Sequence, residues 1–215
     1  MPQIFSKKAN RLPVLTLGGL SGGGILAIAV VWYYFSPSFT DVGYQPIQPV
    51  PYSHEQHVGQ FGLDCRYCHS YVEESAHSNV PSTQTCMNCH TSIRTESLKL
   101  LPVRESWATD IPVQWLKVHH LPDYAQFNHS VHINVGVGCE TCHGRIDQMP
   151  EVVQSKPLSM GWCLTCHRNP EEYLRPPDQV TKMGFQPAPD QIQQNLQRIE
   201  EEGIYPPTDC SGCHY

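Results

Sequence analysis

Cys65-Arg-Tyr-Cys68-His69 is the first of five C-x-x-C-H stretches in the sequence. The other four are Cys86-Met-Asn-Cys89-His90, Cys139-Glu-Thr-Cys142-His143, Cys163-Leu-Thr-Cys166-His167 and Cys210-Ser-Gly-Cys213-His214. This pattern is the attachment signal for c-type haem: both thiols form thioethers with the porphyrin, and the histidine is the proximal iron ligand. A redox dithiol or half of a zinc site would be the alternative for a single copy. Because all ten cysteines lie in the five copies, the sequence predicts five covalently bound haems.

The rest of the composition predicts a loop-rich domain with a small side-chain core. Residues 36–215 number 180 for five haems, or 36 for each, and the whole chain has 19 prolines and 15 glycines. Proline and glycine favour turns over long regular elements. We therefore expect a small, mainly irregular multihaem cytochrome c domain with short helices, in which the porphyrins supply much of the packing surface.

The charge distribution argues against a nucleic-acid partner. The net charge is −6, and Lys7, Lys8 and Arg11 give the first 13 residues +3, so the rest of the chain carries −9. A nucleic-acid partner would require a basic patch instead. The acidic part could meet a basic redox partner, or it could simply be a solvated surface that keeps the protein soluble.

Residues 14–35 form an uncharged apolar run of 22 residues, VLTLGGLSGGGILAIAVVWYYF. A helix rises about 1.5 Å per residue, so this run is long enough to cross a bilayer. The basic residues before it and the aromatic residues at its end predict a cytoplasmic N-terminus over 1–13 and a haem domain on the periplasmic side of the cytoplasmic membrane. A cleaved signal peptide is the alternative. A retained single-pass anchor is favoured because the run exceeds a usual signal-peptide core and no small-x-small site follows it.

The segments after the anchor predict two related units and a terminal addition. Residues 36–51 are rich in proline, which predicts an extended stalk. An aromatic residue and a His-x-x-His pair then precede a C-x-x-C-H stretch twice, in Tyr52-Ser-His54-Glu-Gln-His57 and in Phe127-Asn-His129-Ser-Val-His132. By this repeat, we divide the haem-bearing part into a dihaem module with a connector, a second dihaem module, and a helix with the fifth haem site: 52–126, 127–188 and 189–215.

Two helices are expected between and after the motifs. Residues 91–101 could form a short one. Residues 190–202 predict a longer one, with a capping box at Asp190 and an apolar stripe of Ile192, Leu196 and Ile199. Gly203 should end it.

Seven histidines outside the motifs are candidates for the distal iron position: His54, His57, His77, His119, His120, His129 and His132. The two-residue spacer of a His-x-x-His pair lets its imidazoles point to different haems. By the repeat, we pair distal with proximal histidines as His54 with His69, His57 with His90, His129 with His143, His132 with His167, and His119 with His214, keeping His77 and His120 in reserve. Methionine is the rival distal ligand, and Met149 and Met160 are candidates. Irons filled on both faces do not readily bind a substrate, so electron transfer is predicted instead of catalysis.

Several stretches resemble a known family. These are CRYCH, TQTCMNCH, VHHLPDYAQFNHSVHINVGVGCETCHGRIDQM and LSMGWCLTCHRNP. Their His-x-x-His pairs resemble those of class III multihaem cytochromes, and the stretches together resemble the pentahaem c-type cytochrome subunit of bacterial alternative complex III. The resemblance implies an electron-transfer role, without catalytic activity of its own, in a quinol:electron-acceptor oxidoreductase of the cytoplasmic membrane. It also implies iron–sulfur and quinol-binding subunits and a further cytochrome c as partners. A related membrane quinone reductase complex has a similar multihaem component.

Two other classes remain as alternatives. The first is a self-sufficient, membrane-anchored quinol dehydrogenase; the tetrahaem proteins of that kind carry a methionine just after the first motif, whereas Ser70 and Tyr71 follow His69 here. The second is a pentahaem enzyme similar to nitrite reductase. That family replaces one motif histidine by lysine, and all five motifs here keep histidine.

Overall fold

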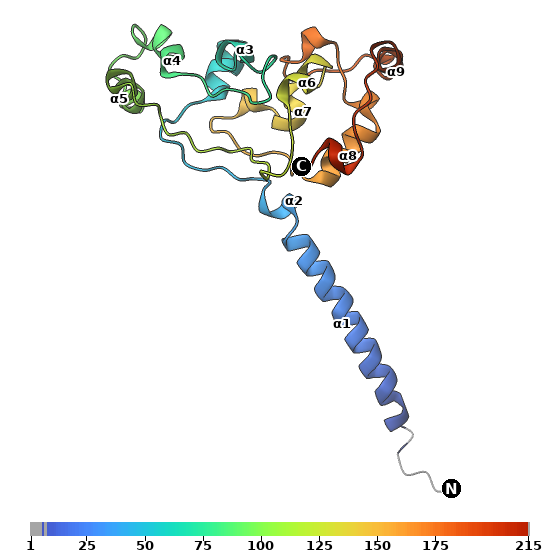
Figure 1. The fold of residues 1–215 in the computed structure, drawn as a ribbon. Coiled ribbons are helices and arrows are strands. Elements are labelled where there is room, and N and C mark those ends of the chain that lie inside the picture. The colour runs from blue at the N-terminus through green and yellow to red at the C-terminus, as the bar shows by residue number, and fades with distance from the viewer. Residues whose placement is uncertain (1–5, 7, 215) are drawn as a thin grey trace. The chain divides into compact units, whose positions relative to one another are not determined.

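The computed structural model describes residue 6 and residues 8–214 (Figure 1). The chain divides into two compact units, Met1–Asp41 and Val42–Tyr215. The described α-helices are α1 Leu12–Tyr34, α2 Pro37–Thr40, α3 Cys65–Cys68, α4 Thr83–His90, α5 Leu101–Thr109, α6 His129–Asn134, α7 Cys139–His143, α8 Met160–Arg168 and α9 Gln191–Glu202. The π-helix η2 spans Glu55–Gln60, and the 3-10 turns are η1 Ala9–Arg11, η3 Leu98–Leu100, η4 Ile146–Gln148, η5 Pro170–Glu172, η6 Pro177–Gln179 and η7 Cys210–Gly212.

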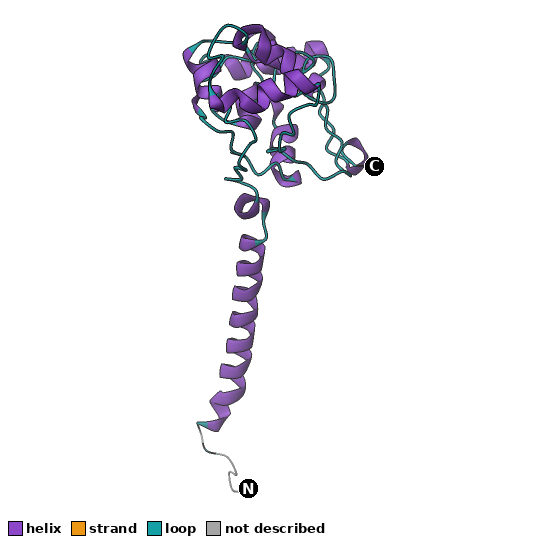
Figure 2. Ribbon diagram, turned by 90° about the vertical axis from the view of Figure 1, so that its left-hand side faces the viewer, coloured by secondary structure: helices purple, strands orange, loops and turns teal. Residues whose placement is uncertain are grey.

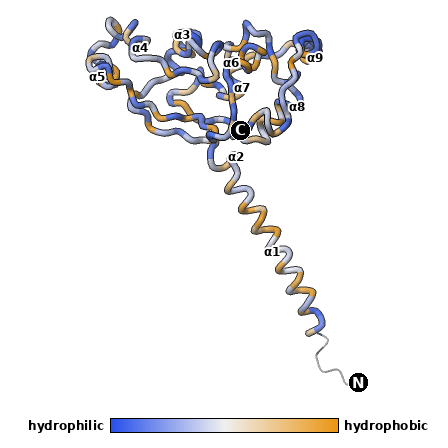
Figure 3. Tube along the Cα trace, in the orientation of Figure 1, coloured by the Kyte–Doolittle hydropathy of each residue, from blue (hydrophilic) through white to orange (hydrophobic). Residues whose placement is uncertain are grey.

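The first unit is built around the long helix α1. Its 23 residues correspond to about 34 Å, enough to cross the roughly 30 Å hydrocarbon core of a bilayer. Together with η1 it is long and apolar enough to span a membrane, with a mean hydropathy of 2.0, and the described structure buries none of it (Figure 3). The helix begins two residues before the predicted run and ends one residue earlier.

The stalk expected over 36–51 is partly helical. One turn, α2, follows Ser36, because Pro37 has the fixed φ that suits the first position of a helix. Phe39 in this turn packs against the rings of Tyr33 and Tyr34, with centroids 5.7 and 4.7 Å away. The extended conformation predicted for the stalk is therefore wrong over residues 37–40.

The second unit consists of short helices joined by long connections (Figure 2). Within the described residues it contains no strand, only the isolated bridges Ala125 with His214 and Val137 with Leu174. This confirms a small, helix- and loop-rich domain that follows one apolar helix in the sequence. Figure 1 shows α4 and α5 towards one side of this unit, α8 and α9 towards the other, and α3, α6 and α7 between them.

The side-chain core of the second unit is small and split. One cluster joins Val50, Met87 and Val103, where α4 packs against α5. A second cluster joins Val137, Leu174 and Ile204. Protein domains of this length normally bury a contiguous hydrophobic core. The described interior therefore leaves room for other apolar groups to complete the packing.

Helix α9 forms where it was predicted but turns a different face inward. Ile192 and Leu196 of the predicted stripe are 53% and 44% exposed, whereas Asn195 is 1% exposed. The Asn195 amide donates to two backbone carbonyls, those of Glu171 and Leu174, at 2.8 and 2.7 Å. Buried polar groups are tolerated when they are hydrogen-bonded in this way, so tertiary contacts override the apolar stripe.

The ends of the predicted helices differ in part from expectation. Gly203 ends α9 with φ of 67°, as predicted, because glycine adopts the left-handed conformation without strain. Asp190 does not cap the helix backbone; its carboxylate accepts from the Gln194 amide at 2.8 Å. The helix expected over 91–101 lies later in the chain, as the turn η3 and helix α5.

Candidate haem attachment sites

Each C-x-x-C-H motif lies on a short helix or helical turn, in α3, α4, α7, α8 and η7. Residues three and four apart share one face of a helix, so this local structure turns the two thiols of a motif toward the same side. Three of these helices have an N-cap side chain that accepts from a backbone amide: Asp64 from Arg66 at 2.9 Å, Ser159 from Trp162 at 3.4 Å and Asp209 from Gly212 at 3.0 Å. The local sequence thus builds a helical platform at each motif.

Seven histidines hydrogen-bond a backbone carbonyl through Nδ1, at 2.7 to 3.3 Å: His57, His69, His90, His129, His132, His167 and His214. A carbonyl oxygen can only accept, so Nδ1 carries the proton in each of these rings. The lone pair is then on Nε2. This is the tautomer and the second contact that metal-ligating histidines normally have.

Two histidine pairs have ring centroids at the spacing of axial ligands. The ring centroids are 6.3 Å apart for His57 and His90, and 6.1 Å apart for His132 and His167. A metal–imidazole bond is about 2 Å and the centroid lies about 1 Å further, so two imidazoles on opposite faces of one metal have centroids about 6 Å apart. Both pairs therefore fit an iron between them.

The surroundings of the two pairs repeat the same geometry. Tyr52 stacks on His57 with centroids 4.4 Å apart and meets His54 edge-on at 4.8 Å. Phe127 stacks on His132 at 4.5 Å and meets His129 edge-on at 4.7 Å. The repeat seen in the sequence is thus also a repeat of local structure, with the aromatic ring fixing the orientation of both histidines.

A large cavity lies between the first and third motifs. Its walls include Cys65, Cys68 and His69 of the first motif, Cys139, Cys142 and His143 of the third, and His54, His129 and His132. The empty space between these walls is about 1120 Å³, part of it open to solvent. The thiols and imidazoles among these walls are the groups that attach and ligate haem.

Burial favours the neutral form of His54 and His143, which line this cavity, and of His119, which lies beside His143. It lowers the pKa of His54 and of His119 to about 4, and that of His143 to about 3. Among the buried atoms of the described residues, His54 Nδ1 and His119 Nε2 have no hydrogen-bond partner. Buried polar nitrogens are costly to leave unsatisfied, and a neutral imidazole is the form that ligates metals. These observations fit the donor set expected around haem iron.

The structure places some distal candidates away from the predicted partner. His119 lies beside His143, with centroids 4.3 Å apart, instead of beside His214. That separation is too short for an iron between the two rings. His129 contacts residues of both repeats. Its Nδ1 donates to the Ala76 carbonyl at 3.0 Å, and it lines the cavity that His143 also lines.

The weaker candidates occupy less enclosed positions. His120 is exposed, and so is Met160 at 65%. His77 lies close enough to His129 to lower its pKa, after the larger effect of burial. Met149 accepts at its carbonyl from the Glu55 amide at 3.0 Å. Met183, for which only a packing role was expected, lines the shared cavity.

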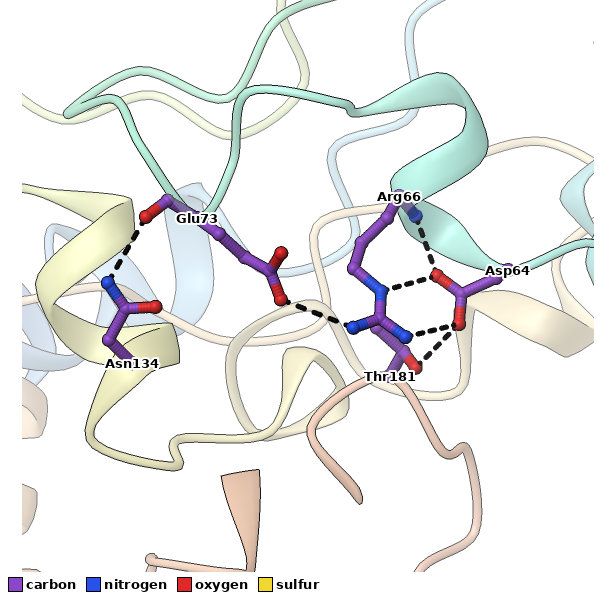
Figure 4. Close-up of polar contacts among 5 residues, drawn as sticks. All are labelled: Asp64, Arg66, Glu73, Asn134 and Thr181. Atoms are coloured by element: carbon purple, nitrogen blue, oxygen red, sulfur yellow. Dashed lines mark hydrogen bonds and ion pairs between the residues drawn. The ribbon is translucent and has the colours of Figure 1, made fainter. Parts of the chain in front are cut away.

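A charged network among residues that line the cavity was missed from the sequence (Figure 4). Asp64 accepts from Arg66 Nε at 2.9 Å and from the Thr181 hydroxyl at 2.9 Å. Arg66 also donates to Glu73 at 3.3 Å, and the Glu73 carbonyl accepts from Asn134 at 3.1 Å. The hydrogen bonds from Arg66 lower the pKa of Asp64 to about 2. Asp64 and Thr181 are 117 residues apart, so no local pattern could have paired them.

A buried ion pair holds the third motif. Glu140 lies inside this motif and accepts from Arg175 at 2.9 Å, from the Gly184 amide at 2.6 Å and from the Phe185 amide at 3.1 Å. The Arg175 side chain is 7% exposed and lies 4.6 Å from the centroid of the Phe185 ring. Gly138 leaves the space for this guanidinium, which a Cβ atom would fill.

Comparisons with known proteins give the family of this chain. Residues 63–215 match the family described as outer membrane cytochrome MtrC/MtrF-like, domains II/IV. The chain is 27% identical over 168 residues to the menaquinone reductase, multiheme cytochrome c subunit of Nitratidesulfovibrio vulgaris (strain Hildenborough), which covers 68% of this chain and 79% of the relative. The chain thus belongs to the MtrC/MtrF-like family of multihaem c-type cytochromes, whose haems are bound covalently.

Proposed function

We propose that this chain is a membrane-anchored pentahaem cytochrome c that conducts electrons within a quinol:electron-acceptor oxidoreductase complex of the alternative complex III type. The observation that carries the proposal is the separation of the ring centroids, 6.3 Å between His57 and His90 and 6.1 Å between His132 and His167. Irons with a histidine on each face exchange electrons and have no free position for a substrate. The chain would act as an electron-transfer subunit without catalytic activity of its own.

The ligand assignment follows the placement of the rings. The five motif histidines are the proposed proximal ligands, and the ten motif cysteines are the proposed thioether positions. His57 and His132 are the proposed distal ligands for the second and fourth motifs. His54 and His129, which line the shared cavity, are proposed for the first and third.

The fifth motif needs a distal ligand from the segment beside it. His214 donates through Nδ1 to the Tyr124 carbonyl at 3.3 Å and forms a bridge with Ala125. His120 lies four residues before Tyr124 and is exposed, whereas His119 is engaged beside His143. These contacts favour His120 over His119 for the fifth iron.

The residues of this chain hold and insulate the redox groups. Haem supplies an iron that cycles between two oxidation states. The carbonyls that accept from Nδ1 fix the ring orientations, and the aromatic rings of Tyr52 and Phe127 pack on the distal histidines. Such second contacts and burial are the means by which a protein sets haem potentials.

Partners are needed to complete the quinol chemistry. Helix α1 offers no enclosed site, because none of it is buried and the Cβ positions of its glycines meet open space. Small residues of this kind allow close packing with another helix in a bilayer. The relative in Nitratidesulfovibrio vulgaris is named as part of a menaquinone reductase. We therefore propose partner subunits with quinol-binding and iron–sulfur sites, a further cytochrome c, a cytoplasmic N-terminus and a periplasmic haem domain.

The decisive experiment extracts the native complex in mild detergent and measures haem, mass and quinol oxidation together. We expect five covalent haems per chain by the pyridine haemochrome assay, low-spin signals from all irons, and a complex in which this chain is a minor mass. Four or fewer haems would contradict the pentahaem assignment. Quinol oxidation by the isolated chain would favour a self-sufficient dehydrogenase, and a high-spin iron that turns over nitrite would favour an enzyme.

A ligand variant tests the saturation of the irons directly. His57→Ala removes one proposed axial ligand, so the reduced protein should gain one iron that binds carbon monoxide and a matching high-spin signal. Glu55→Ala, an exposed neighbour on the same helix η2, is the matched control and should bind none. Equal carbon monoxide binding by both variants would contradict the ligand role of His57.

A further inference from the structure

The first and third motifs are joined through residues 180 and 181. The Val180 carbonyl accepts from the backbone amide of Cys139 at 3.0 Å. The next residue, Thr181, donates to the Asp64 carboxylate at 2.9 Å, and Asp64 starts helix α3 at Cys65. The starts of helices α3 and α7 are therefore both hydrogen-bonded to one dipeptide.

The thiols of these two motifs also meet. A hydrogen bond with the Cys139 thiol lowers the pKa of Cys65, and the same contact raises the pKa of Cys139. Both cysteines line the shared cavity. The first and third attachment sites are thus immediate neighbours, although 74 residues separate the two cysteines in the sequence.

The second motif adjoins the first. The Asn88 amide, between the cysteines of the second motif, donates to the hydroxyl of Tyr67 in the first at 3.4 Å. Tyr52 lines the shared cavity and stacks on His57, which faces His90. One aromatic side chain therefore lies between the first and second sites.

The fourth motif adjoins the third by the equivalent contacts. His132 lines the shared cavity and faces His167. Phe127 also lines this cavity and stacks on His132, with ring centroids 4.5 Å apart. The third and fourth sites are thus in contact across the second repeat.

The fifth motif adjoins the fourth. His167 donates through Nδ1 to the Pro207 carbonyl at 2.7 Å, three residues before Cys210. Burial raises the pKa of the Cys163 thiol, and the nearby thiol of Cys213 contributes to the rise. Figure 1 agrees with this succession, because α4, α3, α7 and α8 follow one another across the second unit.

We propose that the five attachment sites adjoin one another in the order second, first, third, fourth, fifth, and that the first and third sites form the junction between the two repeats. The order rests on the proposed function, because it requires a haem at every motif. The second and fifth sites are then the two ends of the electron path. If the sites instead adjoined in the order in which they occur in the sequence, the second site would lie between the first and third and would not be an end of the path.

The test counts how many other haems respond when one potential is changed. A methionine ligand raises the potential of its iron relative to histidine. That iron is then reduced earlier in the titration. Each adjoining haem must accept its electron beside an iron that is already reduced and therefore less positive. The apparent potential of the adjoining haem therefore falls. EPR-monitored redox titration of the purified complex resolves these shifts for His57→Met and His132→Met, once the haemochrome assay has shown five haems in each.

The two orders give different counts. In the proposed order, His57→Met changes an end site and shifts one other haem, whereas His132→Met changes an interior site and shifts two. In chain order both variants shift two. Two shifts with His57→Met, one with His132→Met, or none with either would overturn the proposal.

A second variant keeps the test valid should His57→Met lose haem. Ile93→Lys places a charge on the exposed surface, at the residue whose carbonyl accepts from His90, and leaves every proposed ligand in place. It should change the potential of the haem at the second site most and shift the potential of one other haem. A haem count below five in the unsubstituted complex would contradict the proposed function and not the order.

Discussion

The ion pair between Glu140 and Arg175 gives the sharpest stability prediction. Arg175→Met removes the guanidinium from a position that is 7% exposed and leaves Glu140, itself 15% exposed, without its cationic partner. Breaking a buried pair from one side costs about 3–5 kcal/mol. The Gly184 and Phe185 amides still donate to the carboxylate, which favours the lower end, and the lost contact with the Phe185 ring adds about 0.5–1 kcal/mol. We expect Arg175→Met to lose about 3–4 kcal/mol.

Guanidinium denaturation of the purified, haem-loaded protein, followed by far-ultraviolet circular dichroism, measures this loss. Arg145→Met is the matched control, because Arg145 pairs with Asp147 at 2.7 Å but is 45% exposed. Exposed ion pairs contribute little, so this variant should keep the wild-type midpoint. The double variant Glu140→Met with Arg175→Met should lose less than Arg175→Met alone, because no buried charge remains.

Two results would refute a stabilising role for this ion pair. If Arg175→Met and Arg145→Met have the same midpoint, the buried pair does not hold the third motif. Additive losses in the double variant would likewise show that the two side chains do not interact.

Three further perturbations follow from the same contacts. Gly59→Ala places a methyl group where the Asp147 carbonyl oxygen lies, so η2 must move from η4 and we expect a loss of about 1–3 kcal/mol by denaturant titration. Asn195→Leu leaves two buried backbone carbonyls without their donor, which should cost about 2–3 kcal/mol in the same titration. Asp64 has a pKa of about 2, below its usual value, so its stabilising effect is present above pH 4 and is lost as the pH falls through 2. The difference in denaturation midpoint between wild type and Asp64→Asn should therefore shrink as the pH falls over that range.

Each of these has an internal comparison. Gly161→Ala meets open space at the start of α8, so an equal loss for Gly161→Ala and Gly59→Ala would contradict the steric argument. Gln197→Leu replaces an amide that reaches an exposed carboxylate on the same helix as Asn195, and it should be nearly neutral. A midpoint difference for Asp64→Asn that stays constant from pH 5 to 2 would show that its carboxylate is not held by Arg66.

The structure departed from sequence expectation wherever distant segments meet. The apolar stripe of α9 predicted that Ile192 and Leu196 would be buried, but Asn195 is buried instead, because carbonyls 21 and 24 residues away accept its hydrogen bonds. His119 was expected to serve the fifth haem and lies beside His143. Neither outcome has a local signal, since each depends on loops that lack any periodicity.

The sequence by itself determined the chemistry and the class of this protein. The C-x-x-C-H motifs predict covalent haem attachment because thioether spacing and the adjacent ligand are local properties. The 22-residue apolar run predicts a helix because length and hydropathy are local too. The His-x-x-His repeat likewise predicted a recurring structure, since each aromatic ring and its two histidines lie within six consecutive residues.

Only the tertiary structure decided which motifs are neighbours. Asp64 and Thr181, or Cys65 and Cys139, meet because the second repeat folds back onto the first around a shared cavity. With so few buried hydrophobic side chains, these irregular connections are positioned by individual hydrogen bonds, and no pattern along the chain encodes such contacts. The order of the sites in space is therefore a property of the fold.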